Sequence, residues 1–180
     1  MPYLYHLKPE PMRGDTLYPL NQLKHVDPAL YRRQLAKYDD HPRRKTLPNR
    51  VIPKLDCLWN DVLHFSPVHP CLIYQAWLEL GKKLKETTFY RVPVAQVAAH
   101  PAVIYTLPQK KQLDTNLPES CVEWLDTTAF TELEVLPPAT VEWYARLRRR
   151  KQVGGFFVGI PHVLVKGAVK INEENSIGWC

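Results

Sequence analysis

The segment from Trp59 to His69 mixes polar and titratable side chains into a dense apolar stretch. Buried polar groups need hydrogen-bond partners, so this mixture indicates either a ligand site or a polar cluster that satisfies its own loop. If residues 61–65 form a strand, alternate side chains share one face. Asn60, His64 and Ser66 would then line one wall, where a histidine and a hydroxyl can donate and accept hydrogen bonds.

A helix expected over residues 70–80 begins directly after this wall. Its apolar residues have helical spacing, and Gly81 suits the position that ends a helix. The free amides of its first turn would point toward an anion bound beside the strand. The segment therefore combines histidine chemistry with an anion-binding helix end.

Two further histidines belong to other expected strands. A strand over residues 3–7 carries His6, and the last strand, over residues 162–171, begins at His162. Convergent polar groups mark a site, whereas a lone strand histidine is more often a packing residue. Their functional value therefore depends on whether both meet His64 in space.

A hydrolase or nuclease is an alternative function for the same region. Its polar groups would be Asp56, Asp61, His64 and His69, and it would work with or without a divalent metal. We expect no metal site, because the sequence has neither a His-x-x-x-His pair nor a Cys-x-x-Cys motif. A thiol nucleophile, Cys57 or Cys71 beside His64, also stays open because such pairs assemble in space. No phosphate-cradling glycine loop, nucleophile elbow or dinucleotide fingerprint is present.

The whole pattern predicts an α+β fold in one compact domain spanning residues 1–180. The chain has 45% hydrophobic and 23% charged residues, enough to build one core. We expect a mixed or mostly antiparallel sheet and about three helices. The expected helices cover residues 28–37, 70–80 and 140–151, and the expected strands cover residues 3–7, 61–65, 87–92, 102–106, 130–136 and 162–171. Residues 10–21 read as a loop, and Thr140 reads as a helix N-cap.

Four widely separated cysteines and the absence of an export signal predict reduced thiols and a cytoplasmic location. The longest apolar stretch, residues 156–169, is broken by Gly159, Pro161, His162 and Lys166, so no membrane span is expected. The oligomeric state stays open.

The net charge of +6 favours an acidic partner such as nucleic acid or a nucleotide. The charge is spread over several short clusters, and the arginines of residues 146–151 also suit the negative end of a helix dipole. A second hypothesis is therefore a non-enzymatic binding domain, for nucleic acid or a protein partner, that uses residues 146–151 and 43–50.

Two segments resemble a known family. The run Leu4-Tyr5-His6-Leu7 resembles the first strand of ADP-ribosyltransferase-like proteins, and residues 64–73 are similar to the strand, turn and helix of DarT-type nucleic-acid ADP-ribosyltransferases. These two runs comprise 14 residues of the chain. The chain departs from that pattern at Val68, where the DarT-type turn carries an arginine.

The resemblance implies a transferase that uses NAD. His6 would hold the ribose, Tyr18 or Tyr90 would stack on nicotinamide, and a glutamate would stabilise the oxocarbenium-like transition state. Nucleic acid would be the acceptor, and without such a glutamate the fold would serve as a binding module. The candidate catalytic residues are His64, Glu132 and Glu134, and the candidate cofactor-binding residues are His6, Tyr18, Asn60, Ser66 and Tyr90.

Overall fold

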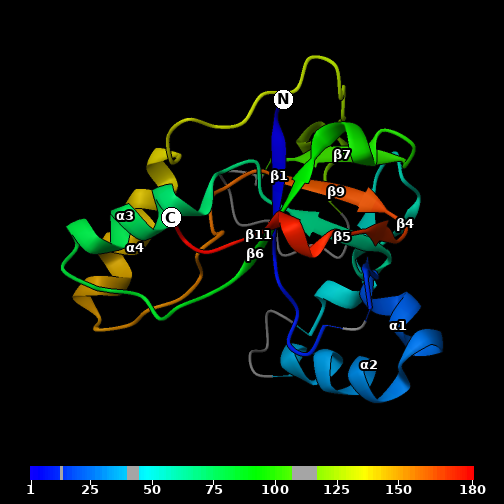
Figure 1. Ribbon diagram of the computed structural model, residues 1–180, viewed down its shortest axis with the longest axis horizontal. Coiled ribbons are helices and arrows are strands. Elements are labelled where there is room, and N and C mark those ends of the chain that lie inside the picture. Colours follow the sequence, from blue (N-terminus) through cyan, green and yellow to red (C-terminus); the bar gives the residue numbers. More distant parts are fainter. Residues whose placement is uncertain (13, 40–44, 107–116) are drawn as a thin grey trace.

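Two antiparallel sheets form the centre of the molecule, and this confirms the α+β prediction (Figure 1). The computed structural model describes residues 1–12, 14–39, 45–106 and 117–180. The larger sheet has the order β5-β9-β7-β8, with strands β5 (Val62–Phe65), β9 (His162–Lys166), β7 (Ala102–Tyr105) and β8 (Val122–Trp124). The smaller has the order β1-β6-β11, with strands β1 (Tyr3–Leu7), β6 (Phe89–Pro93) and β11 (Ser176–Ile177).

Two short strand pairs lie outside these sheets. They are β2 (Thr16–Leu17) with β10 (Val169–Lys170), and β3 (Val51–Ile52) with β4 (Cys57–Leu58).

The two sheets are joined where β1 crosses the end of β5. The amide of Tyr5 donates to the carbonyl of Ser66 at 2.9 Å, and the amide of Ser66 donates back to the carbonyl of Tyr5 at 2.8 Å. This reciprocal pair extends one antiparallel step from β5 onto β1. Residues on either side of the crossing are thereby held next to one another.

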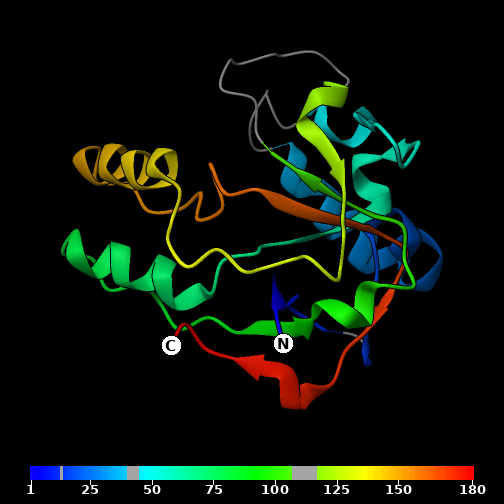
Figure 2. The ribbon, with the colours of Figure 1, turned by 90° about the horizontal axis from the view of Figure 1, so that it is seen from above.

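Four α-helices in the described residues pack as two pairs (Figures 1 and 2). They are α1 (Leu20–Val26), α2 (Pro28–Leu35), α3 (Pro70–Glu79) and α4 (Pro138–Arg149). Short 3₁₀ turns are η1 (Ala36–Tyr38), η2 (Leu47–Asn49), η3 (Trp59–Asp61), η4 (Val94–Val97), η5 (Glu119–Cys121) and η6 (Glu173–Asn175). Figure 2 shows α4 stacked on α3 at one end of the molecule. None of these helices is both long and apolar enough to cross a membrane.

Local signals explain where the predicted helices begin and end. The carboxylate of Asp27 accepts from the amide of Leu30 at 2.9 Å, and Pro28 occupies the first turn, so α2 begins where the sequence indicated. The helix α3 ends one residue before the expected Leu80. Gly81 follows it with a φ of 72°, a left-handed conformation that favours glycine.

Three apolar clusters form the core. The first fills the space between the two sheets, and the second lies beside β3, β4 and β7. The third lies under α3 and α4, where Trp77 and Tyr144 have ring centroids 5.2 Å apart. Trp179, near the end of the chain, packs into this third cluster against Phe89. The C-terminal segment is therefore part of the core.

Several predicted elements were wrong in detail. Residues 130–136 are not a strand, because only Leu133 makes a single bridge, to Val68. The expected loop over residues 10–21 contains β2 and the start of α1. Thr140 is not an N-cap, since α4 begins two residues earlier and buries it.

The strands near the histidines also differ from their expected bounds. Asp61 closes the 3₁₀ turn η3, so β5 begins one residue later. The last strand is broken at Gly167, whose φ of 105° suits glycine. A β-carbon there would lie 3.3 Å from Nδ1 of His100, so the close approach also favours glycine.

The cysteine prediction was wrong. Cys71 and Cys180 form a disulfide that links the start of α3 to the C-terminal segment. Their separation of 109 residues hid the pair in the sequence, whereas the fold brings their Cα atoms to 4.7 Å. Cys57 and Cys121 are free thiols. The disulfide therefore removes the support that reduced thiols would give to a cytoplasmic location.

The third core cluster yields a test of stability. Replacing the fully buried indole in Trp77→Ala leaves a cavity under α3 and α4 and is expected to lower the free energy of unfolding by about 3–5 kcal/mol. Urea unfolding measures this change. The matched control is Trp124→Ala, since that side chain is 56% exposed and its loss should change stability by less than about 1 kcal/mol. Equal effects would contradict the assigned core.

Candidate functional site

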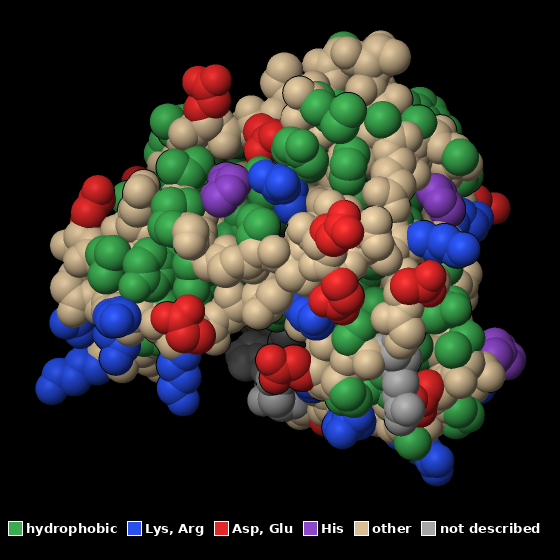
Figure 3. Space-filling view, in the orientation of Figure 1, with side chains coloured by type: hydrophobic (Ala, Val, Ile, Leu, Met, Phe, Trp, Pro, Cys, Tyr) green, Lys and Arg blue, Asp and Glu red, His purple; other side chains and the backbone are tan. Residues whose placement is uncertain are grey.

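A cavity of about 730 Å³ lies between the α1–α2 pair, the end of β1, β5 and the segment before β6. We call it the histidine pocket, after His6 and His64. Figure 3 shows that the surface is hollowed between the α3–α4 end and the α1–α2 pair. The pocket is lined by residues 6–10, 18–20, 23, 30, 34, 37, 38, 60, 62–64 and 85–88. Four predicted site residues therefore share it, namely His6, Tyr18, Asn60 and His64.

His6 is held in one tautomer by its own strand. Its Nδ1 lies 2.7 Å from the carbonyl oxygen of Leu7, and its ring packs against Phe65 at 5.3 Å between centroids. Burial lowers the pKa of His6 to about 4, so the ring is neutral at pH 7. Because a carbonyl only accepts, Nδ1 carries the proton. The other ring nitrogen, Nε2, is left as a hydrogen-bond acceptor.

His64 is fixed in the complementary tautomer. Its Nε2 donates to the carbonyl of Trp59 at 3.0 Å, which leaves Nδ1 as the acceptor. Burial, and then the neighbouring His162, lower the pKa of His64 to about 3. The ring is therefore neutral at pH 7 and is a poor proton acceptor there.

His162 converges on the same region without lining the pocket. Its ring centroid lies 6.4 Å from that of His64, and its Nδ1 donates to the carbonyl of Ile160 at 2.8 Å. Burial also lowers the pKa of His162. The three histidines thus form a chain in which His6 and His64 face the pocket and His162 supports His64 from behind.

Asn60 carries a buried donor that lacks a partner. The side chain is only 2% exposed, and its Oδ1 accepts from the hydroxyl of Tyr38 at 2.8 Å. Its Nδ2 has no hydrogen-bond partner among the described residues. Since buried donors are nearly always paired and Asn60 lines the pocket, this amide is a candidate donor to a bound molecule.

Aromatic and cationic groups complete the lining. Tyr18 and Tyr38 supply rings, while Lys8 and Lys85 supply positive charge. Lys8 forms a salt bridge of 2.9 Å with Glu173, whose carboxylate raises the pKa of the lysine. Lys8 lies two residues after His6, so the alternation of a strand could have pointed to it, whereas no pattern in the sequence marks Tyr38.

Two predicted cofactor-binding residues, Ser66 and Tyr90, make contacts outside the histidine pocket. The buried hydroxyl of Ser66 accepts from the amide of Val68 at 3.1 Å and so stabilises the turn before α3. Tyr90 is buried in β6 and donates to Glu173 at 3.0 Å. Neither side chain lines the histidine pocket.

The predicted catalytic glutamates lie on the other face of β1. Glu132 accepts from the amide of Tyr3 at 2.9 Å and from the hydroxyl of Tyr5 at 2.6 Å. Burial and this carboxylate raise the pKa of Tyr5. Alternation along β1 turns Tyr3 and Tyr5 away from His6. Glu132 and Glu134 line a second cavity of about 600 Å³ and are not brought to the histidine pocket.

The residues of the hydrolase hypothesis are also separated. Both carboxylate oxygens of Asp61 are occupied, by Asn21 at 2.7 Å and by the amide of Leu58 at 2.8 Å. His69 lines the second cavity, and Asp56 is exposed in a turn. Within the described ranges, no group of three or more histidine, cysteine or acidic residues has the geometry of a metal site.

Of the two cysteines proposed as nucleophiles, only Cys57 keeps a free thiol. Cys71 is consumed by its disulfide with Cys180, so it cannot act as a nucleophile beside His64 in this state. Cys57 is buried, and burial raises the pKa of its thiol. A raised pKa disfavours the thiolate that nucleophilic attack requires.

No known family model matches the chain, and no curated protein or solved structure is significantly similar to it. The histidine pocket itself therefore supplies the functional argument.

The half-buried histidines of the site make stability depend on pH. In the unfolded chain they titrate near 6.5, whereas in the fold His6 titrates near 4 and His64 near 3. As the pH falls from 6.5 toward 4, the unfolded state therefore takes up protons that the folded state does not. The free energy of unfolding should fall through this range, and urea unfolding at stepped pH measures it.

The variant His6→Gln/His64→Gln is expected to flatten this dependence without abolishing it, because burial also lowers the pKa of His162. The matched control is His25→Gln, which changes an exposed histidine of α1 and should keep the wild-type slope. An unchanged slope in the double variant would show that these two rings are not the titrating groups.

Proposed function

We propose that this protein binds NAD in the histidine pocket and belongs functionally with ADP-ribosyltransferases. The observation that carries the proposal is the presence of His6, Tyr18, Asn60 and His64 in one pocket. These residues come from three separate segments of the chain, and the resemblance of the first strand implied a ribose contact for His6. A volume of about 730 Å³ lies within the range of small-molecule and cofactor sites.

The hydrogen-bonding character of the pocket suits a ribose. Neutral His6 and His64 each offer one acceptor nitrogen, and sugar hydroxyls are donors. The unpaired Nδ2 of Asn60 offers a donor to a carbonyl or a ring nitrogen of the ligand. Tyr18 offers a ring for stacking, and Lys85 offers charge for the diphosphate.

The proposed reaction transfers ADP-ribose. The bond between nicotinamide and the ribose carbon breaks, a nucleophile of the acceptor forms a bond to the same carbon, and the acceptor loses a proton. A carboxylate would stabilise the positive charge that develops on the ribose. Glu10 and Glu86 are the carboxylates among the lining residues, so we assign this role to one of them in place of Glu132 and Glu134.

A second candidate function is NAD or nucleotide binding without catalysis. It is favoured by the position of Glu132 and Glu134 on the opposite face of β1, where they serve Tyr3 and Tyr5 or line the second cavity. The two functions share the pocket and differ in whether nicotinamide is released.

Ligand-induced stabilisation tests the binding step. NAD at a hundredfold excess over its Kd should stabilise the fold by about 2.7 kcal/mol and raise the melting temperature. His6→Ala and Asn60→Ala should each abolish or reduce this shift. The control His25→Ala, outside the pocket, should retain it. The absence of a shift at millimolar NAD would remove the proposal.

Release of nicotinamide tests the catalytic step. Glu10→Gln and Glu86→Gln preserve size and remove the charge, so one of them should abolish release while NAD still stabilises the protein. Glu132→Gln is the matched control and should keep the wild-type rate. NAD binding without nicotinamide release, with nucleic acid present as acceptor, would select the non-catalytic function.

A further inference from the structure

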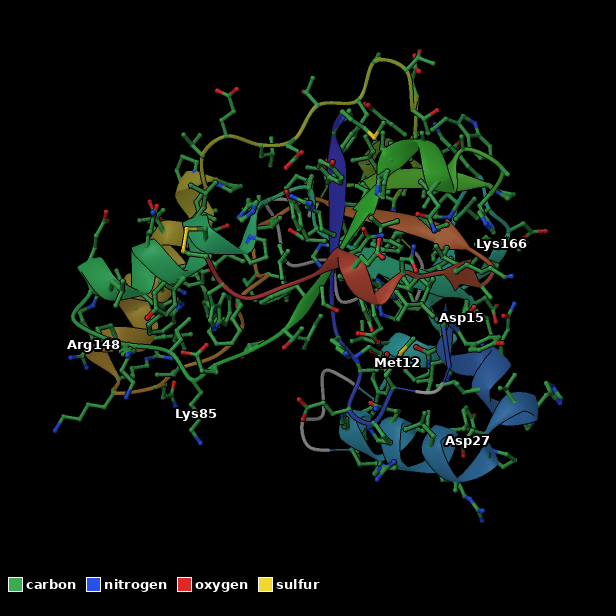
Figure 4. The ribbon with its side chains drawn as sticks, in the orientation of Figure 1. Met12, Asp15, Asp27, Lys85, Arg148 and Lys166 are labelled. Atoms are coloured by element: carbon green, nitrogen blue, oxygen red, sulfur yellow. A yellow bond between two sulfur atoms is a disulfide. The ribbon has the colours of Figure 1, made fainter. Side chains whose placement is uncertain are left out.

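The disulfide between Cys71 and Cys180 lies within reach of small thiols. Cys71 is half-buried and lines the second cavity, and Cys180 is exposed. Figure 4 shows the bond between the start of α3 and the end of the C-terminal segment. Exposed disulfides are the labile, regulatory or catalytic ones, because a thiolate can reach their sulfur atoms. The position of this bond therefore suits exchange as well as structural support.

The two sulfur atoms of the disulfide have unequal surroundings. Cys71 occupies the second position of α3, a helix of ten residues, where the helix dipole stabilises a negative charge. In thiol–disulfide exchange, a sulfur that is stabilised as the thiolate is the better leaving group. An incoming thiolate is therefore expected to attack the exposed sulfur of Cys180 and to release Cys71.

The disulfide secures a segment that contacts the wall of the histidine pocket. This C-terminal segment, residues 173–180, pairs with β6 through β11. The indole Nε1 of Trp179 donates to the carbonyl of Lys85 at 2.8 Å. At the other end of the segment, the carboxylate of Glu173 accepts from Nζ of Lys8 at 2.9 Å. Lys8 and Lys85 both line the pocket, so the segment contacts its wall at two points.

The middle of the wall segment before β6 is positioned by Trp179. Residues 82–88, all within the described part of the chain, form neither helix nor strand. The amide of Lys82 donates to a carbonyl of α3, and the carbonyl of Thr88 accepts from the amide that follows β1, both at 2.9 Å. The bond from Trp179 to Lys85 lies between these two ends. Because the indole is only 4% exposed, its place in the core sets the place of this carbonyl.

We propose that the bond between Cys71 and Cys180 is a thiol–disulfide exchange site that a dithiol reductant opens, and that opening frees the C-terminal segment from the pocket wall. The first thiolate of the reductant bonds to Sγ of Cys180, and the bond from Cys180 to Cys71 breaks. The second thiol attacks the mixed disulfide, which releases Cys180 and closes a disulfide within the reductant. The two protons of the dithiol pass to Cys71 and Cys180, so the reductant is oxidised as the protein disulfide is reduced.

Local opening connects the chemistry to the wall. Reduction removes the covalent constraint and leaves β11 and Trp179 held by noncovalent contacts alone. A segment that is no longer cross-linked regains conformational freedom when it detaches, so its opening costs less free energy. The carbonyl of Lys85 then loses its donor. This inference concerns the wall whichever ligand the pocket takes, so it does not rest on the binding of NAD.

Limited trypsin digestion of the native protein, with and without dithiothreitol, tests the exchange site. The peptide bond after Lys85 contains the carbonyl that Trp179 holds, so cleavage there reports release of that contact. Reduction without denaturant should speed this cleavage by about tenfold or more, because proteolysis follows the population of the open form. Cleavage after Lys24, an exposed residue of α1, should keep its rate. Thiol alkylation and mass spectrometry identify the reduced cysteines.

Three variants separate the bond from the contact that it secures. Cys71→Ser/Cys180→Ser should be cut at the fast rate with or without dithiothreitol. Trp179→Phe keeps an aromatic ring and removes the indole donor, so cleavage after Lys85 should rise while the disulfide stays oxidised. The matched control Cys121→Ser removes a free thiol and should keep the wild-type response to dithiothreitol.

Several outcomes would overturn the proposal. A disulfide that resists dithiothreitol until denaturant is added is structural and is not an exchange site. Unchanged cleavage after Lys85 in the reduced protein or in Trp179→Phe would show that the segment does not hold the wall. Equal acceleration after Lys24 and Lys85 would show global unfolding instead of local release. NAD is absent from these digests, so failure of its thermal shift would remove the proposed function alone.

Discussion

The reciprocal backbone pair between Tyr5 and Ser66 is the constraint on which the functional region depends. It joins the two sheets at the one crossing of β1 and β5, at 2.9 and 2.8 Å. His6 follows Tyr5 directly and His64 precedes Ser66 by two residues, so the same crossing sets both rings beside the pocket. Ser66, predicted as a ligand contact, contributes through its backbone and through a hydroxyl that stabilises the next turn. A polar residue inside an apolar stretch can thus serve a site without touching the ligand.

Burial of the histidines decides what the site can do. A charged imidazolium in either half-buried position would lose part of its hydration without gaining a described carboxylate partner, so the rings stay neutral at pH 7. Backbone carbonyls of Leu7 and Trp59 then select the tautomers. The result is a pair of fixed acceptors rather than a general base, because a pKa of about 3 or 4 leaves little driving force for proton removal at neutral pH. Recognition of hydroxyl donors follows more directly than acid–base catalysis.

Local chemistry made part of this structure predictable from the sequence. Asp27-Pro28 and Pro70 with Gly81 mark helix ends by capping and by backbone freedom, and both helices lie close to their expected bounds. Relationships between distant segments were not predictable. The disulfide joins residues 109 apart, and Glu132 bonds to Tyr5 across 127 positions, so no local pattern records either contact. The apolar and β-branched character of residues 130–136 suggested a strand, yet one bridge to Val68 is all that the segment forms.

The basic end of α4 shows how one sequence feature can hold two roles. Cations near a helix C-terminus stabilise the helix through its dipole, by typically 0.3–1 kcal/mol each, and the effect falls off within the last turn. Arg148 uses its side chain in that way and also fixes the neighbouring loop by donating to Leu80. Arg149 and Arg150 form no salt bridge with a described residue, and their charge at the end of the helix suits the dipole in the same way. Because Arg148 also donates to the C-cap residue of α3, one arginine serves both the dipole of its own helix and the contact between the two helices.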